Sequence, residues 1–171
     1  LTLLPEAQQA AYDGLAGRVG AAVAIDPRTG AILAMVSRPS FDPNPLANPD
    51  AEVQEAAWTA LETDQAEPAL NRAIARTYPP GSVFKLVTAA AALESGEYTP
   101  ETTVPGPAEL PLSGSTSVLT NQSGGACGPD DQTTLTDALR ISCNTAFGAI
   151  GVDLGDDVLR AQAEAFGYNT Q

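Results

Sequence analysis

The sequence contains no histidine, a single lysine and only two cysteines among its 171 residues. Without histidine, a Ser-His-Asp triad, a Cys-His pair and a histidine-based zinc site are all excluded within this chain. No run of 18 apolar residues is present, so the sequence predicts no membrane-spanning helix. Basic residues are also few: 8 stand against 21 acidic ones, and the formal net charge of −13 argues against nucleic acid and anionic membrane surfaces as partners.

The composition is that of a folded domain. Apolar residues make up 43% of the chain and charged residues 17%, which is typical of a globular protein and not of a disordered one. A chain of 171 residues is long enough for one domain with a substantial core. The acidic residues are spread along the sequence, so we interpret them as a solvated surface and not as a binding tail.

The first third of the chain predicts a helix, a β-hairpin and a second helix. Residues 5–17 begin with a proline and end with a glycine, as helices commonly do. Two apolar runs within residues 19–38 flank the turn sequence DPRTG at 26–30, a pattern typical of a β-hairpin. Residues 50–62 show helical periodicity, and Asp50 is a suitable N-cap for them.

The rest of the chain predicts mainly helices. The segment 82–95 is apolar on every side, and a helix of this kind belongs in a protein core. Residues 99–134 are rich in Gly, Pro, Ser and Thr, so we expect a long loop or a few short strands. Helical patterns resume on both sides of a polar interruption at 142–144, and a last helix is expected from about Asp156 to Gly167.

The only lysine, Lys85, lies in the apolar segment, three residues after Ser82. Residues three apart share a helix face, so Ser82 Oγ and Lys85 Nζ can meet. A lysine needs a lowered pKa to act as a base at neutral pH, and burial lowers its pKa by penalising the charged form. The start of a helix also presents free main-chain N–H groups that can receive an oxyanion. The pattern therefore indicates a serine nucleophile with a lysine base.

A purely structural interpretation explains the same residues. Ser82 is also a suitable helix N-cap, and Lys85 can extend along an apolar surface until its amine reaches water. Ser142 and Asn144 interrupt a helical stretch with a hydroxyl that can relay a proton and an amide that can orient a substrate amide. A turn or a helix cap accounts for that pair equally well, and asparagines elsewhere, such as Asn121, produce similar patterns by chance.

These short motifs resemble those of a known family. The sequence YPPGSVFK, ending at Lys85, resembles the S-x-x-K motif of the penicillin-binding proteins, the peptidoglycan D,D-transpeptidases, and SCN at 142–144 resembles their S-x-N motif. The segments AAVAIDPRTGAILAMVSRPSFDPN and LNRAIARTYPPGSVFKLVTAAAALE are similar to the first hairpin and to the central helix of these domains. The similarity extends over almost the whole chain and is closer to the class B enzymes of division or elongation than to β-lactamases.

The resemblance implies a fold and a role for each motif residue. The implied fold is α+β, with an antiparallel sheet covered by helices on both faces, as in penicillin-binding proteins and serine β-lactamases. Ser82 would attack the D-Ala-D-Ala carbonyl of a stem peptide, with Lys85 as the base. Ser142 would pass a proton toward the leaving group, and Asn144 would hold the substrate amide. A neighbouring stem peptide would resolve the acyl-enzyme, and β-lactam antibiotics would acylate the same serine.

The sequence departs from the family in its third motif. A K-[ST]-G motif is absent, because Lys85 is the only lysine. We therefore expect residues 1–171 to be the N-terminal portion of a transpeptidase domain, with only its hairpin and helical part present. A two-stranded sheet with bare edges is unstable alone, so the rest of the domain is an expected partner, for example as a second polypeptide after nicking in a loop.

The resemblance also implies where the protein acts and what it binds. The family is usually tethered outside the cytoplasmic membrane, so we expect an anchor outside this sequence. In an exported protein Cys127 and Cys143 can form a disulfide, and the sequence leaves open whether they do so or remain free thiols. The resemblance implies no metal or organic cofactor. The expected partners are peptidoglycan stem peptides, β-lactams and the rest of the domain, with no nucleic acid.

Two other functions stay open at this point. A serine β-lactamase would share Ser82 and Lys85 but would hydrolyse its acyl-enzyme. A penicillin-binding sensor or scaffold would bind without turning over peptide. The lifetime of the adduct on Ser82 separates these functions from a transpeptidase.

Overall fold

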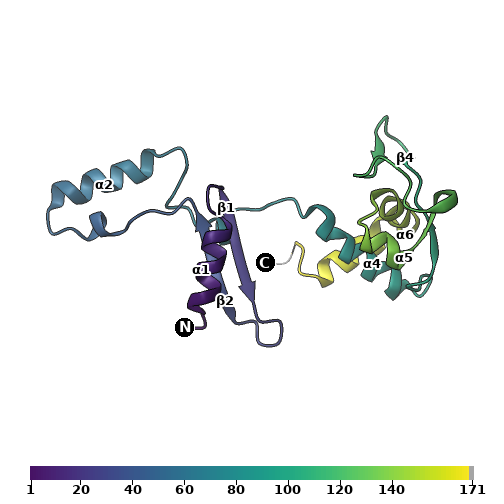
Figure 1. Ribbon diagram of the computed structural model, residues 1–171, viewed down its shortest axis with the longest axis horizontal. Coiled ribbons are helices and arrows are strands. Elements are labelled where there is room, and N and C mark those ends of the chain that lie inside the picture. The colour runs from purple at the N-terminus through teal and green to yellow at the C-terminus, as the bar shows by residue number, and fades with distance from the viewer. Residues whose placement is uncertain (170–171) are drawn as a thin grey trace. The chain divides into compact units, whose positions relative to one another are not determined.

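The computed structural model describes residues 1–169, and the chain divides into two compact units, Leu1–Tyr78 and Pro79–Gln171 (Figure 1). The first unit holds the predicted hairpin, and the second holds the residues of the S-x-x-K and S-x-N motifs. Among residues 1–169, no helix is both long enough and apolar enough to cross a bilayer.

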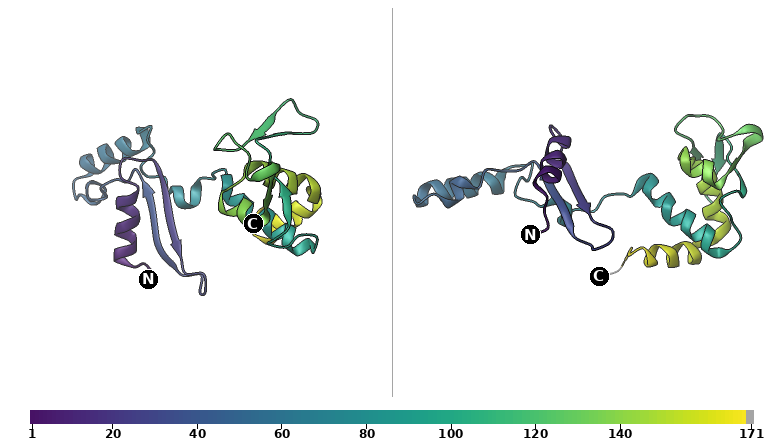
Figure 2. Two further views of the ribbon diagram at one scale, coloured as in Figure 1. Left: turned by 45° about the vertical axis from the view of Figure 1, so that its right-hand side comes forward. Right: turned by 60° about the horizontal axis from the view of Figure 1, so that its bottom comes forward.

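A helix and a hairpin form the centre of the first unit. Helix α1 (Pro5–Gly14) precedes the antiparallel strands β1 (Gly20–Ile25) and β2 (Ile32–Arg38), so the predicted helix and hairpin are confirmed. Gly30 ends the turn with a φ of 72°, a conformation that suits a residue without a side chain. Helix α1 lies along the hairpin and packs mainly against β2, as the views in Figures 1 and 2 agree.

Strand β2 does not have the bare outer edge that the sequence suggested. The Gln8 side chain donates to Met35 O at 2.8 Å and accepts from Met35 N at 2.8 Å, and the Leu4 N–H donates to Leu33 O at 2.9 Å. A glutamine amide offers the same donor and acceptor as a peptide group, so α1 and the residues before it take the place of a neighbouring strand. The expectation of two bare edges is therefore wrong for β2.

The second predicted helix of the first unit is also confirmed. Helix α2 (Ala51–Thr63) begins after Asp50, whose carboxylate accepts a hydrogen bond from Glu52 N at 2.9 Å. The proline-rich segment before it contains the short 3₁₀ helix η1 (Asn44–Ala47), and α3 (Arg72–Ala75) follows it. The N-cap at Asp50 thus does what its position in the sequence predicted.

The second unit combines helices with two pairs of short strands. In chain order its elements are η2 (Gly81–Val83), α4 (Phe84–Ser95), β3 (Thr103–Pro105), β4 (Glu109–Pro111), β5 (Val118–Thr120), η3 (Pro129–Asp131), β6 (Gln132–Thr134), α5 (Leu135–Arg140) and α6 (Asn144–Ala165). Strand β3 pairs with β6 and β4 pairs with β5, both antiparallel. The prediction of a few short strands over residues 99–134 is confirmed.

The core of the second unit lies where α4 packs against α6, close to α5. Ala92, Ala138, Ala146 and Ile150 are at most 1% exposed, and they belong to one continuous apolar cluster. Small side chains on three helices let their backbones approach closely, and this close packing supports both motif segments.

Helix α4 is apolar on all sides, but only one of its sides is buried. Val87 and Ala92 are 3% and 0% exposed, whereas Leu86 and Leu93 are 53% and 45% exposed. The prediction of a helix buried on every side is therefore wrong. Apolar side chains are suited to burial, but many remain exposed, and the sequence does not show which segment packs against each of them. Lys85 is half-buried at the boundary between the two sides.

The last predicted helix is confirmed as the second half of α6. Gly155, with φ 77° and ψ 170°, interrupts the helical backbone one residue before the predicted start at Asp156. Gly167 has a φ of 90° and follows the end of the helix, as its position in the sequence predicted.

Candidate active site

The site begins at the junction between η2 and α4. Gly81 has a φ of 55°, which brings the chain into the tight turn of η2, and Ser82 follows it on the surface. Ser82 lies two residues before the start of α4 and Lys85 lies in its first turn, so both face the same side. Within residues 1–169, the Ser82 main-chain N–H donates to no protein acceptor, so it is free to stabilise a negative charge at this position.

The amine of Lys85 brings the four predicted site residues together. Its Nζ atom lies 3.3 Å from Ser82 Oγ, 3.0 Å from Ser142 Oγ, 2.7 Å from Ser142 O and 2.6 Å from Asn144 Oδ1. The ring centroid of Phe147 lies 5.9 Å from the same nitrogen. A single amine thus joins the S-x-x-K segment to the S-x-N segment, 57 residues further along the chain.

The hydrogen-bond donors and acceptors of this cluster suit a base. The carbonyl oxygen of Ser142 and the amide oxygen of Asn144 only accept hydrogen bonds, so each takes an N–H from Lys85. A neutral amine then has its lone pair left for the hydroxyl hydrogen of Ser82 or Ser142. The ammonium form instead donates its third N–H to one of the two hydroxyls. The site therefore holds Lys85 in both states that proton transfer requires.

The pKa of Lys85 is lowered from its ordinary value of 10.5 because burial penalises the charged amine. This direction agrees with the sequence-based expectation, although Lys85 is only half-buried. The oxygen atoms around Nζ are uncharged, so among residues 1–169 no ion pair with a carboxylate restores the charged form. A larger fraction of neutral amine is present at a given pH than for a lysine in water.

Ser142 provides a second connection between the nucleophile and the base. Its Oγ lies 3.0 Å from Ser82 Oγ and 3.0 Å from Lys85 Nζ, both shorter than the direct distance of 3.3 Å between Ser82 and Lys85. A hydroxyl can accept one proton while it donates another. The arrangement allows a proton to leave Ser82 directly or through Ser142.

The backbone of Ser142 occupies a position that normally suits glycine. It has a φ of 59°, and the N–H groups of Ser142 and Cys143 donate to Leu139 O at 3.1 Å and to Ala138 O at 2.8 Å. This pair of hydrogen bonds is the Schellman ending of helix α5, in which glycine is the usual left-handed residue. A serine there bears conformational strain, and its hydroxyl is what a glycine would not supply.

Asn144 is held at both ends of its side-chain amide. Its Oδ1 accepts from Lys85, and its Nδ2 donates to Thr120 O in β5 at 2.8 Å. An amide nitrogen carries two hydrogens, so one of them has no protein partner among residues 1–169. This remaining N–H is the one available to a substrate.

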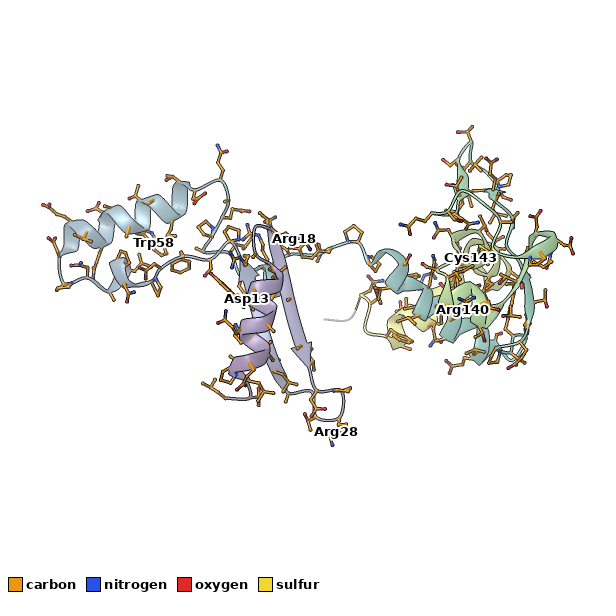
Figure 3. All side chains as sticks on the ribbon, in the orientation of Figure 1. Asp13, Arg18, Arg28, Trp58, Arg140 and Cys143 are labelled. Carbon is orange, nitrogen blue, oxygen red and sulfur yellow. A yellow bond between two sulfur atoms is a disulfide. The ribbon has the colours of Figure 1, made fainter. Side chains whose placement is uncertain are left out.

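Two further features of the site, a buried asparagine and a disulfide, were missed or left open by sequence reasoning. Asn121, which the sequence presents as one asparagine among several, is buried and accepts hydrogen bonds from the N–H groups of Asn144 and Thr145 at 2.9 and 3.1 Å. Cys127 and Cys143 form a disulfide, so the middle residue of the S-x-N motif, labelled in Figure 3, is tied to the preceding loop. No local sequence signal distinguishes Asn121, because its partners are distant along the chain.

A cavity of about 400 Å³ lies beside the S-x-N motif. It leaves room for a ligand next to Ser142, and no charged side chain contributes to its walls. Its lining residues are Asn121, Gln122, Ser123, Ala126, Cys127, Ile141, Ser142 and Cys143. Residues 1–169 contain no group of three or more His, Cys, Asp or Glu side chains arranged to hold a metal ion.

Comparison with known sequences places this site in a family context. The family model described as the penicillin binding protein transpeptidase domain matches residues 20–171. The peptidoglycan D,D-transpeptidase PbpA of Mycolicibacterium smegmatis is 47% identical over 174 residues, which cover 99% of this chain and 35% of that protein. The peptidoglycan D,D-transpeptidase MrdA of Escherichia coli is 36% identical over 168 residues, which cover 98% of this chain and 26% of that protein.

Comparison with solved structures agrees. Penicillin-binding protein A from M. tuberculosis, in its penicillin G acyl-enzyme complex, has a TM-score of 0.94 and 45% sequence identity over 99% of this chain and 40% of that one. The PBP2 of Pseudomonas aeruginosa has a TM-score of 0.84 and 35% identity, covering 100% of this chain and 36% of that one. The α+β transpeptidase fold implied by the sequence motifs is thereby confirmed. The chain spans 35% and 26% of the length of these two curated relatives.

Proposed function

Since this chain belongs to the penicillin-binding protein transpeptidase family, we propose that it is part of a peptidoglycan D,D-transpeptidase that works through an acyl-enzyme on Ser82. The observation that carries this proposal is the position of Lys85 Nζ, which contacts Ser82, Ser142 and Asn144 at once. The substrates are stem peptides ending in D-Ala-D-Ala, and the product is a cross-link of the cell wall made during division or elongation.

In the first step Ser82 Oγ attacks the carbonyl carbon of the penultimate D-Ala. Its proton passes to neutral Lys85, either directly or through the Ser142 hydroxyl. The Ser82 main-chain N–H stabilises the oxyanion that forms on the carbonyl oxygen. When the C–N bond breaks, the protonated Lys85 returns a proton through Ser142 to the departing amine, and the terminal D-Ala leaves. The peptide is then joined to Ser82 as an ester.

In the second step an amine of a neighbouring stem peptide attacks the ester carbon. Lys85 takes a proton from this amine, and Ser82 Oγ recovers a proton as the ester bond breaks. The free N–H of Asn144 Nδ2 is suited to hold the amide of the bound peptide in both steps. One amide bond has been broken and one formed, so no oxidant, metal or organic cofactor is required.

β-Lactams have a strained amide in the place of the D-Ala-D-Ala bond, and we propose that they acylate the same serine. The M. tuberculosis relative named above is described as a penicillin G acyl-enzyme complex, which supports this extension to the present chain. The leaving group of a β-lactam stays attached to the adduct. The adduct therefore breaks down slowly, and its added mass identifies the acylated residue.

We also propose that the protein works outside the cytoplasm, where its stem-peptide substrates are assembled into the wall. The Cys127–Cys143 disulfide supports this location, since disulfides persist in oxidising compartments and are rare in the cytosol. An anchor and the remaining part of the domain would lie outside this sequence. We propose that this remaining part supplies the K-[ST]-G motif and completes the substrate site.

The decisive experiment is mass spectrometry of the full-length protein before and after one equivalent of penicillin G. We expect a mass increase equal to one penicillin, located by peptide mapping on Ser82, that persists for at least an hour. Matched variants are Ser82→Ala, which should form no adduct, and Ser95→Ala, which removes a serine at the other end of α4 and should acylate normally. An adduct that hydrolyses within minutes would indicate a β-lactamase, and a stable adduct without peptide cross-linking would indicate a sensor or scaffold. An absent adduct would contradict the proposal.

A further inference from the structure

Asn121 is a buried polar side chain that joins the segment after β5 to the start of helix α6. It is 7% exposed, and every hydrogen-bonding position of its amide is occupied. Its Nδ2 atom lies 2.9 Å from Pro107 O, 2.9 Å from Gly125 O and 3.1 Å from Thr145 Oγ1. The Thr145 hydroxyl in turn donates to Pro107 O at 2.7 Å. These contacts hold the Asn121 amide in one orientation.

The oxygen of the same amide closes the N-terminus of α6. Asn121 Oδ1 accepts from Asn144 N at 2.9 Å and from Thr145 N at 3.1 Å. The N–H groups of the first residues of a helix have no partner inside the helix, so a side chain elsewhere must satisfy them. Asn121 does so from a distance of 23 residues along the chain. It thereby fixes the backbone of Asn144.

The backbone position of Asn144 controls the position of its side chain beside the base. Asn144 Oδ1 lies 2.6 Å from Lys85 Nζ, which is the shortest of the contacts that surround this amine. Building on the proposed function, we propose that Asn121 is a positioning residue for acylation: it holds Asn144 where that side chain orients Lys85 toward Ser82. Asn121 itself touches neither the nucleophile nor the base.

Only an asparagine satisfies this position. The two oxygen lone pairs receive two helix N–H groups, and the two amide hydrogens go to two carbonyl oxygens. An aspartate would place an oxygen against Pro107 O and Gly125 O. An alanine would remove the side-chain partner of Gly125 O and of the two helix N–H groups, and it would leave Pro107 O with the Thr145 hydroxyl alone. A reversed amide would set N–H against N–H, so the observed orientation is the one that the network permits.

A simple helix cap would explain the burial and the hydrogen bonds, but it predicts a different result on mutation. Loss of a cap lowers stability and leaves the chemistry of the folded fraction unchanged. Loss of a positioning residue changes the reaction of the folded fraction. It also displaces Asn144 Oδ1, an oxygen that favours the charged form of Lys85. The pKa of Lys85 should then be lower, so the pH at which acylation becomes active should fall.

The groups recorded around Lys85 Nζ make this pH readout interpretable. They are the hydroxyls of Ser82 and Ser142, the main-chain carbonyl oxygen of Ser142, the amide of Asn144 and the ring of Phe147. Within residues 1–169, no acidic or basic side chain forms an ion pair with it. We call the low-pH side of the plot of acylation rate against pH its acid limb. A shift of this limb therefore reports on the uncharged contacts of Lys85.

The test measures the rate constant for acylation of Ser82 by a fluorescent penicillin from pH 5 to pH 10, in the full-length protein. For Asn121→Ala we expect a loss of about 100-fold, the cost of misplacing a catalytic group by about 1 Å. We also expect the acid limb to move to lower pH. In an Asn144→Ala background, the further substitution Asn121→Ala should have little effect, because the two residues act in series. Asp50→Ala, which removes the N-cap of α2, is the matched control and should change neither the rate nor the limb.

A second variant covers the case in which Asn121→Ala fails to fold. Thr145→Val keeps the volume of a fully buried side chain but removes the hydroxyl that contacts Asn121 and Pro107. We expect a smaller loss of rate with a limb shift in the same direction. Normal acylation and an unchanged limb in the folded variants would overturn the positioning role alone. No adduct on the unmodified protein would contradict the proposed function, and this inference with it.

Discussion

Replacing Ser142 by glycine should stabilise the protein relative to alanine at the same position while both variants lose activity. Ser142 has a φ of 59°, and a residue with a side chain pays about 1–2 kcal/mol for this left-handed conformation. Glycine avoids that cost but loses about 0.5–1 kcal/mol more backbone entropy on folding. The difference leaves Ser142→Gly more stable than Ser142→Ala by roughly 1 kcal/mol. Both variants lack the hydroxyl that lies 3.0 Å from Ser82 Oγ and 3.0 Å from Lys85 Nζ.

Two measurements on the same samples test this reasoning. Urea unfolding gives the free energy of unfolding of the two variants, and a fluorescent penicillin gives the rate of acylation of Ser82. We expect Gly to exceed Ala in stability, and both variants to acylate more slowly than the unmodified protein by at least about tenfold, since a positioned proton relay contributes about 10²–10⁴-fold. The carbonyl oxygen of residue 142 is retained in both, so Lys85 keeps that contact.

Each half of this prediction has its own refutation. If Ser142→Ala is as stable as Ser142→Gly, the left-handed backbone at this position bears no strain, and the Schellman ending of α5 explains nothing about the choice of serine. If Ser142→Gly acylates at the unmodified rate, the hydroxyl is not a proton relay. The direct path of 3.3 Å between Ser82 and Lys85 would then suffice.

Three further predictions concern the base, the disulfide and a tyrosine. Lys85→Arg should abolish penicillin acylation, because a guanidinium does not deprotonate. In the unmodified protein the acylation rate should rise with pH at values below the ordinary lysine pKa of 10.5. Acylation by the arginine variant would rule out a base at this position. Reduction of the Cys127–Cys143 disulfide should lower the free energy of unfolding by about 3 kcal/mol, which is the chain entropy that closing this ring removes from the unfolded state. Urea unfolding with and without a dithiol measures this difference, and coincident curves would contradict it. Burial, then the hydrogen bond to Asp153, raises the pKa of Tyr98 to about 12, so the folded protein holds this proton more tightly than the unfolded chain. The free energy of unfolding should therefore fall as pH rises from about 10 to about 12. Tyr98→Phe should remove that fall, together with the step near pH 12 in an ultraviolet titration of the tyrosines.

Much of the local structure could be predicted because its causes are local. The turn at Gly30, the cap at Asp50 and the helix break next to Asp156 depend on the backbone preferences of single residues and their neighbours. The pair Ser82 and Lys85 could also be predicted, since two residues three apart near a helix start meet on one face whatever surrounds them.

Other features depended on partners far along the chain. The exposed side of α4, with Leu86 and Leu93, has the same apolar composition as its buried side, and only the packing against α6 distinguishes them. The sequence presents Gln8 as an ordinary helical residue, yet its side chain forms hydrogen bonds with the main chain of Met35 at the edge of β2. No periodicity in the sequence encodes either outcome.

The sequence by itself determined which chemistry is available: one lysine, no histidine, and two serines and an asparagine in spaced motifs. Tertiary structure decided that these groups meet, because Ser142 and Asn144 reach Lys85 only when α6 packs on α4. It also decided that Asn121 closes the helix beside them. The physical reason is that side-chain type fixes what a group can donate or accept, whereas distance and burial fix whether it does so, and both arise from contacts between residues remote in sequence.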